Sequence, residues 1–248
     1  YYNYPRAYKM IDELQPQAVI FSDGGPGCRW VGNEKGFAGA TNWSFLRAGE
    51  VYPGYPNYRE LQYGHADGNQ WVAAECDVSI RPGWFYHPEE DGRVKTVDEL
   101  TDLYYRSVGH NATLLLNFPV DRDGLIHPTD SANAVNFHQN VQKQLAHNLL
   151  AGLSPKASDE RGRTFSAKAV TDGDYDTYWA TNDDVISATI EFDLPQAEKI
   201  NRMMLQEYIP LGQRVKSFVV EYNQAGEWIP VKFNEETTTI GYKRLLRF

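Results

Sequence analysis

The chain has 248 residues, which is enough for one large domain or two modest ones. Its hydrophobic share of 42% and its mean hydropathy of −0.55 are typical of a soluble globular protein. A formal net charge of −9 argues against a nucleic-acid partner, because such binding requires clustered basic residues. No apolar run approaches the roughly 20 residues of a membrane-spanning helix, so we expect no membrane span. The first residues lack the pattern of a signal peptide.

Strand and helix patterns alternate over residues 1–149. The segment TLLLNF is continuously apolar, as in a strand that is covered on both faces. Thr96 followed by Glu99 has the signature of a capping box and predicts the start of a helix. The alternation predicts a parallel sheet wrapped by helices, interrupted by an irregular stretch at 24–70. The expected strands are 18–23, 71–80 and 113–118, and the other expected helices are 8–14 and 128–149.

The pattern changes at a polar segment that contains AGLSPKASDERGR and predicts a linker at 150–163. Beyond it only strands are expected. The segments ATIEFDL and SFVVEY alternate, so that each has one buried and one solvated face. Residues 164–248 are therefore expected to form a β-sandwich. Its strands are expected at 188–194, 202–209, 217–222, 228–233 and 238–248.

Two loop motifs carry the residues that suggest chemistry. The first, FSDGGPGCRWVGNEKG at 21–36, follows an apolar strand and displays Arg29, Trp30 and Glu34. Loops at the carboxyl ends of strands carry catalysis in α/β barrels. The second motif is ECDVSIRPGWFYH at 75–87. Together these motifs resemble the retaining α-L-fucosidases of glycoside hydrolase family 29.

The resemblance covers nearly the whole chain and implies an α/β fold, the C-terminal half of a (β/α)8-like barrel, followed by an all-β jelly-roll sandwich. The motifs AVTDGDYDTYWAT and LQEYIPLGQRVKSFVVEY resemble discoidin-like modules of the F5/8 type C kind. A complete barrel has eight strands in roughly 250 residues, whereas only three are expected before residue 150. The sandwich is also expected to be incomplete at its C-terminal end. We therefore expect a fragment, whose partner is the missing N-terminal half of the barrel.

Glu34 is the expected catalytic acid/base. Retaining glycosidases need two carboxyl groups about 5–5.5 Å apart, one as the nucleophile and one as the acid/base. The acid must hold a proton near neutral pH, which a partly desolvated pocket favours, and Trp30 and Phe37 flank Glu34. The resemblance implies that the acid/base is the Glu of the RWVGNE segment. From the residues alone, the alternative is a solvated loop charge in a turn with Asn33.

Arg29 and Trp84 are the expected substrate-binding residues. The resemblance implies that Arg29 contacts the sugar or orients a carboxylate, and that Trp84 forms the floor of a sugar subsite. The alternative for Trp84 is packing against the barrel rim. Glu75 is the second candidate acid/base, although an ion pair with Arg81 or another Arg would also explain a carboxylate on a strand. Asp77 is expected to face the other side of that strand, toward the helices.

The sandwich contains a candidate calcium loop. Asp172, Asp174 and Thr177 match the D-G-D-x-x-T pattern that often holds structural calcium in related modules, and oxygen donors suit this cation. The alternative is a tight Asx turn at the start of the sandwich. Asn42-Trp43-Ser44 and Asn111-Ala112-Thr113 are glycosylation sequons by pattern.

The function implied is a retaining exo-α-L-fucosidase that releases terminal α-1,3/1,4-linked L-fucose from glycans, without a catalytic cofactor. The family's nucleophile is an Asp in a W-x-D-G-like motif that this chain does not contain, so the chain alone is expected to be inactive. A periplasmic or secreted location is the family-level expectation. The alternative is a non-catalytic carbohydrate-binding or scaffold protein on a degenerate barrel. The expected ligand in either case is a fucosylated oligosaccharide or glycoconjugate.

Overall fold

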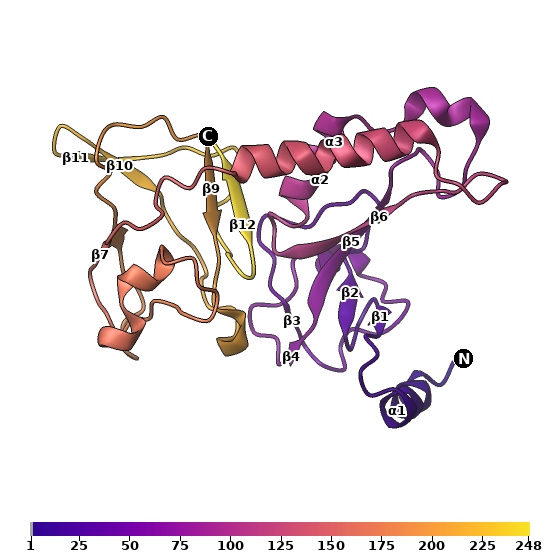
Figure 1. The fold of residues 1–248 in the computed structure, drawn as a ribbon. Coiled ribbons are helices and arrows are strands. Elements are labelled where there is room, and N and C mark those ends of the chain that lie inside the picture. The colour runs from indigo at the N-terminus through magenta and orange to yellow at the C-terminus, as the bar shows by residue number, and fades with distance from the viewer. Residues whose placement is uncertain (1) are drawn as a thin grey trace.

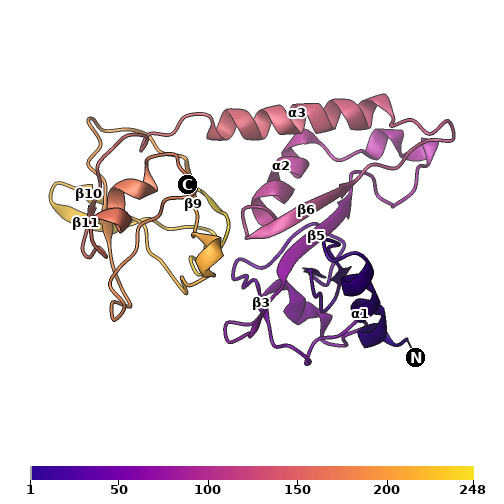
Figure 2. The ribbon, with the colours of Figure 1, turned by 60° about the horizontal axis from the view of Figure 1, so that its bottom comes forward.

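The computed structural model describes residues 2–248, which form two parts in contact with each other (Figure 1). The first part is built on a parallel sheet of four strands in the order β1-β2-β5-β6. Two helices lie along one side of this sheet, and the longer of them leads into the second part, whereas the N-terminal helix lies at the opposite end of the first part (Figures 1 and 2). The strands are β1 (Phe21–Ser22), β2 (Cys28–Trp30), β5 (Ala73–Ser79) and β6 (Ala112–Asn117).

The parallel sheet confirms the predicted strand–helix architecture, but one of its strands was not predicted. β2 lies inside the stretch expected to be irregular, and it pairs with both β1 and β5. The predicted strand at 18–23 is reduced to the two residues of β1. A short antiparallel pair, β3 (Phe45–Leu46) with β4 (Gln70–Trp71), also lies beside the main sheet.

The helices follow the predicted pattern closely. They are α1 (Tyr4–Leu14), α2 (Val97–Arg106) and α3 (Pro128–Leu145). Thr96 caps α2, and its side chain and that of Glu99 form both hydrogen bonds of the capping box. Across residues 2–248, none of the helices combines the length and the apolar character that crossing a bilayer requires.

The two faces of the sheet differ in burial because side chains alternate along each strand. Ala74, Cys76 and Val78 of β5 are buried on the outer face, which the helices cover. Val78 belongs to a core cluster with Leu100 and Leu103 of α2. The opposite, inner face carries half-exposed polar residues of β5, so the outer face of β5 is the better packed of the two.

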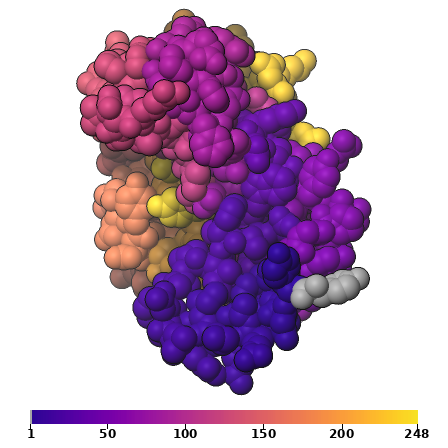
Figure 3. Space-filling view, turned by 90° about the vertical axis from the view of Figure 1, so that its right-hand side faces the viewer, coloured from indigo at the N-terminus to yellow at the C-terminus, as the bar shows by residue number. Residues whose placement is uncertain are grey.

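Figure 3 shows the side of the first part that lies away from the sandwich, with α1 and its neighbours below and the α2–α3 region above. On the far side, the second part consists of paired short strands. β7 (Lys156–Ala157) pairs with β8 (Ile190–Glu191), and β9 (Arg202–Leu205) pairs with β12 (Arg244–Arg247). β10 (Glu221–Gln224) forms a hairpin with β11 (Glu227–Pro230).

The β-sandwich of the second part is confirmed, but its strands are shorter than predicted. The expectation of strands alone was wrong, because three short 3-10 helices lie at Arg163–Phe165, Ala167–Val170 and Ile209–Leu211. The predicted strand at 188–194, for example, keeps only the two residues of β8. β7 lies within the segment predicted to be a linker, and its pairing with β8 places it in the sandwich. The polar composition of residues 150–163 hid this strand, because two residues are too short to show a period.

A buried ion pair fastens the loop after β5 to α3. Arg81 and Asp130 are both fully buried, and the guanidinium donates to the carboxylate through Nε at 2.8 Å and Nη2 at 2.9 Å. The Nη1 atom of Arg81 also lies 2.9 Å from Oδ1 of Asp91. The ring of Tyr86 lies under the guanidinium, 4.6 Å from its carbon. These contacts fix the segment 81–91 against the helix layer.

We expect Asp130→Asn to lower the free energy of unfolding by about 3 kcal/mol, because a buried charge that loses its partner is strongly destabilising. Urea denaturation followed by circular dichroism measures this loss. Asp123→Asn, at an exposed turn position, is the matched control and should change stability little. Equal stability of the two variants would show that Asp130 does not anchor this loop.

Candidate active site

The carboxyl ends of the four parallel strands meet at one edge of the sheet. β2 leads into the loop that carries Glu34, and β5 leads into the loop that carries Trp84. β6 ends at Asn117, beside the end of β5 at Ser79. Loops at this edge of a parallel sheet form the ligand sites of α/β proteins.

Glu34 and Trp84 are in direct contact at this edge. The indole Nε1 of Trp84 donates to Oε2 of Glu34 at 2.8 Å, although the two residues are 50 positions apart in the chain. Trp84 is half-buried and Glu34 is exposed. The structure therefore brings together the predicted acid and the predicted sugar-binding ring. Their roles in catalysis stay a prediction.

Asn117 supports this contact and was not singled out from the sequence. Its Nδ2 donates to the backbone oxygen of Trp84 at 3.1 Å and to Oγ of Ser79 at 3.1 Å. It thus holds the loop after β5 from the end of the next strand. The only sequence signal was a polar residue at the end of the apolar segment TLLLN.

The surroundings of Glu34 differ from the prediction. The indole of Trp30 does not enclose Glu34 but donates to Oδ1 of Asp77 at 2.8 Å. The ring of Phe37 lies under the guanidinium of Arg106, 4.2 Å from its carbon. Trp84 is the aromatic partner of Glu34 instead. Two indole N–H groups therefore each hold one carboxylate at this site.

Glu75 and Asp77 lie on the same face of β5, so the expectation that they point to opposite sides was wrong. Residues two apart on a strand share a face, and here Cys76 is the residue that points toward the helices. Burial raises the pKa of Glu75 above its ordinary value, and the neighbouring charge of Asp77 raises it further. Burial also raises the pKa of Asp77, and the charge of Glu34 adds to this rise. The inner face of the sheet is thus acidic.

Arg81 is not the partner of Glu75, because its guanidinium is occupied by Asp130 and Asp91. Glu75 instead has the thiol of Cys28 on the neighbouring strand, with Sγ 3.9 Å from Oε2. Burial raises the pKa of Cys28 to about 11, and the charge of Glu75 contributes to this rise. Cys28 and Cys76 are both free thiols.

Arg29 has a different position from the one predicted for a sugar contact. Its side chain is completely buried on the outer side of β2, with no surface available to a ligand. Its Nε donates to the backbone oxygen of Leu61 at 2.9 Å, and Nη1 donates to that of Val72 at 2.5 Å. Its Nη2 donates to Oδ1 of Asn42 at 2.6 Å. In this structure Arg29 connects the segments that contain Leu61, Val72 and Asn42, and it does not reach the site of Glu34 and Trp84.

Asp172, Asp174 and Thr177 lie together in the sandwich, held by hydrogen bonds within their own loop. Oδ1 of Asp172 accepts from the backbone N–H of Asp174 at 2.9 Å, and Oδ2 accepts from the Thr177 hydroxyl at 2.7 Å. This is the geometry of an Asx turn. Residues 2–248 contain no group of three His, Cys, Asp or Glu side chains placed to hold a metal. Calcium at this loop stays a prediction, which the dependence of the melting temperature on calcium and chelator would test.

The comparison with known proteins gives this geometry a context. Residues 154–245 match the protein family described as the F5/8 type C domain. Alpha-L-fucosidase 1 of Arabidopsis thaliana is 38% identical over 251 residues, which are 97% of this chain and 48% of the relative. The chain is similar to the C-terminal half of α-L-fucosidases.

Solved structures agree with this similarity. A candidate α-L-fucosidase of Bacteroides thetaiotaomicron has a TM-score of 0.92 and 41% identity, covering 99% of this chain and 55% of that protein. A glycoside hydrolase family 29 fucosidase of Ruminococcus gnavus, solved in complex with fucose, has a TM-score of 0.87 and 32% identity. The matched region covers 100% of this chain and 52% of the Ruminococcus gnavus protein. The chain thus spans about half the length of these proteins, and its fold is the C-terminal part of a (β/α)8-like barrel followed by a β-sandwich.

We expect Glu75→Gln to raise the melting temperature at pH 7 but not at pH 3.5. The pKa of Glu75 is higher in the folded protein than in the unfolded chain. Stability is therefore lost as the pH rises from the pKa of the unfolded chain through that of the folded protein, because Glu75 ionises less readily when folded. Below both values the carboxyl is neutral in each state and the variant gains nothing. Thermal melts of both proteins from pH 3.5 to 7 measure the difference. Glu89→Gln, at an exposed position, is the control, and a pH-independent gain for Glu75→Gln would contradict this cause.

Proposed function

We propose that this chain belongs to a retaining exo-α-L-fucosidase that releases terminal α-1,3/1,4-linked L-fucose from glycans, with Glu34 as the acid/base. The observation that carries the proposal is the Glu34–Trp84 hydrogen bond at the carboxyl edge of the parallel sheet. The similarity of the whole chain to α-L-fucosidases supports the choice of sugar. Neither observation selects the linkage, which rests on the resemblance of the loop motifs.

The proposed reaction has two steps in which Glu34 changes its role. In the first, an Asp from outside this chain attacks the anomeric carbon while Glu34 protonates the leaving oxygen. In the second, Glu34 takes a proton from water, which attacks the same carbon and releases fucose with its configuration retained. Oε2 of Glu34 is occupied by Trp84, and within residues 2–248 Oε1 has no protein partner. Oε1 is therefore the atom we assign to proton transfer.

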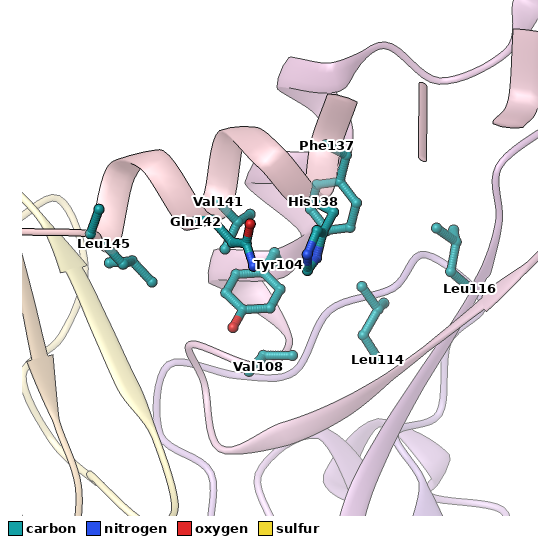
Figure 4. A pocket seen from close by; sticks show the side chains of 10 residues that line it. Tyr104, Val108, Leu114, Leu116, Phe137, His138, Val141, Gln142 and Leu145 are labelled. Carbon is teal, nitrogen blue, oxygen red and sulfur yellow. The ribbon is translucent and has the colours of Figure 1, made fainter. Parts of the chain in front are cut away.

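The rest of the proposed enzyme must cover two surfaces of this chain. β1 and β6 are the edges of the parallel sheet, and Leu115 on β6 is 45% exposed. An apolar hollow of about 730 Å³ lies between α2, α3 and the outer face of β6 (Figure 4). Unpaired edges and open apolar surface are both unfavourable in water. We propose that the N-terminal half of the barrel covers them. The residues lining the hollow are Tyr104, Val108, Leu114, Leu116, Phe137, His138, Val141, Gln142, Leu145 and Ala146.

We expect Glu34→Gln, in the protein with a complete barrel, to reduce kcat on a natural fucosylated glycan by roughly 10²- to 10⁴-fold. An aryl fucoside with a good leaving group needs no protonation, so its first step should stay fast and give a burst of released phenol. Rapid-mixing kinetics on both substrates measures this split. Full glycan activity in Glu34→Gln, together with an inactive Glu75→Gln, would assign the acid to Glu75.

We expect that residues 1–248 alone neither bind nor hydrolyse an aryl α-L-fucoside, because the proposed nucleophile and half of the sheet are absent. Co-expression with the N-terminal half of the barrel should restore turnover and yield a stable complex. Size-exclusion chromatography with an activity assay on the same fractions measures both. Wild-type turnover by the 248 residues alone would refute the division of the site. Fucose binding without turnover by the complex would favour the non-catalytic alternative.

A further inference from the structure

The loop that carries Glu34 is held along its second half by the sandwich. We define the acid loop as residues 31–44, from the end of β2 to the start of β3. Four of its residues form hydrogen bonds with side chains of the sandwich. The shortest of these bonds are Arg244 Nη1 to Ala40 O at 2.5 Å, Thr41 Oγ1 with Thr238 Oγ1 at 2.8 Å, Asn42 N to Thr239 Oγ1 at 2.8 Å, Gln213 Nε2 to Asn42 O at 2.8 Å and Ser44 N to Gln213 Oε1 at 2.8 Å.

Asn42 is the centre of this contact, since it is completely buried and all of its polar groups are bonded. Its backbone N–H and C=O are bound by Thr239 and Gln213 of the sandwich. Its Nδ2 donates to the backbone oxygens of His110 at 2.7 Å and Asn111 at 3.1 Å, just before β6. Its Oδ1 accepts from Arg29 on β2. One residue thus connects the sandwich, through its backbone, to β2 and to the segment just before β6, through its side chain.

The bond from Asn42 to Arg29 is important because of the charge involved. Arg29 is fully buried, and its three hydrogen bonds all go to amide oxygens, with no carboxylate among them. Burial lowers the pKa of Arg29 to about 10, so it stays charged at neutral pH. A buried cation cannot lose an acceptor without a large cost in free energy. A shift of Asn42 would therefore have to be followed by Arg29 on β2, which lies five residues before Glu34.

Both glycosylation sequons lie in this network. Asn42 is completely buried and Asn111 is 7% exposed. Nδ2 of Asn111 donates to Asn42 O at 3.1 Å and to Ser44 Oγ at 3.0 Å. A Cβ added to Gly241 of the sandwich would lie 2.2 Å from Cγ of Asn111, so the two domains approach closely here. These asparagines are structural hydrogen-bonding groups, with no room for a glycan in the folded protein.

We propose that Thr239 and Gln213 of the sandwich are positioning residues for the catalytic acid, acting through Asn42 and Arg29 on the loop that carries Glu34. The proposal rests on the acid role given to Glu34 above, and it assigns the sandwich a part in catalysis beyond its own stability. Catalysis is sensitive to displacement of the reacting groups by about 1 Å. A loop held at five polar atoms by another domain moves only if that domain moves.

A second set of contacts joins the same two domains without touching the acid loop. Nε of Arg202 on β9 donates to the Tyr105 hydroxyl of α2 at 2.9 Å and lies 3.3 Å from Oε1 of Gln144 on α3. Arg202 therefore joins the sandwich to the helices through side chains that form no hydrogen bond with Asn42. It provides a control that weakens the domain interface but leaves the acid loop untouched.

The test compares Thr239→Val with Thr239→Ser in the protein with a complete barrel. Valine has the shape of threonine but cannot accept from the Asn42 N–H, whereas serine can. We expect Thr239→Val to lower kcat on a fucosylated glycan by about 10- to 100-fold, with KM and the aryl fucoside burst rate unchanged. Thr239→Ser should keep the wild-type values. If Thr239→Val does not fold, Thr238→Val, at the half-exposed end of the same contact, should give the same split with a smaller effect.

Arg202→Gln should lower the melting temperature without changing the ratio of glycan to aryl fucoside rates. An unchanged ratio in all variants, or an equal loss in Arg202→Gln, would overturn the positioning role and leave the sandwich as a stabilising domain. Hydrogen exchange of residues 31–38 gives a readout that does not need activity. We expect faster exchange in Thr239→Val than in Thr239→Ser, and equal rates would refute the positioning of the acid loop by Thr239. A wild-type protein that hydrolyses neither substrate would refute the proposed function. The exchange result would still show whether Thr239 holds the acid loop in place.

Discussion

The buried guanidinium of Arg29 is the constraint on which the arrangement of the loops depends. A charge removed from water must find acceptors for its N–H groups, and here these are the backbone oxygens of Leu61 and Val72 and the side chain of Asn42. The three acceptors come from segments separated by up to 30 residues, so the charge can be satisfied only when all of them converge on β2. The cost of failing to converge exceeds the gain of any single hydrogen bond, which makes the arrangement cooperative.

This constraint also removes the independence of the two domains. Asn42 uses its side chain on the barrel and its backbone on the sandwich, so neither domain can shift without breaking a buried hydrogen bond. Arg81 performs a comparable task for the loop of Trp84, but it does so with the carboxylate of Asp130 inside a single domain. The two loops that meet at Glu34 and Trp84 are therefore anchored by two buried arginines, one through the domain interface and one through the helix layer.

The sequence predicted the features that depend on neighbouring residues. The capping box of Thr96, the apolar strand β6 and the helix at Pro128 are local patterns, and each appears in the structure. The expectation that β6 is covered on both faces was wrong, because Leu115 is 45% exposed. β2 was missed because it has three residues with an arginine in the middle, which reads as a loop until its partners are known. The burial of Arg29 and the contact of Glu34 with Trp84 depend on segments far apart in the chain. The error over Asp77 was different, since the period of two along a strand already placed it on the face of Glu75.

The two donors that hold carboxylates at the candidate site are neutral indole N–H groups, and their neutrality affects the carboxyl groups they bind. An arginine or lysine beside a carboxyl favours the ionised form and lowers its pKa. Trp84 and Trp30 instead orient Glu34 and Asp77 with indole N–H groups, which fix a carboxyl oxygen without adding a charge. The case of Asp77 shows which effect is larger, because burial raises its pKa despite the hydrogen bond from Trp30. A neutral donor thus leaves burial free to favour the protonated form of Asp77, which a cation in the same place would oppose.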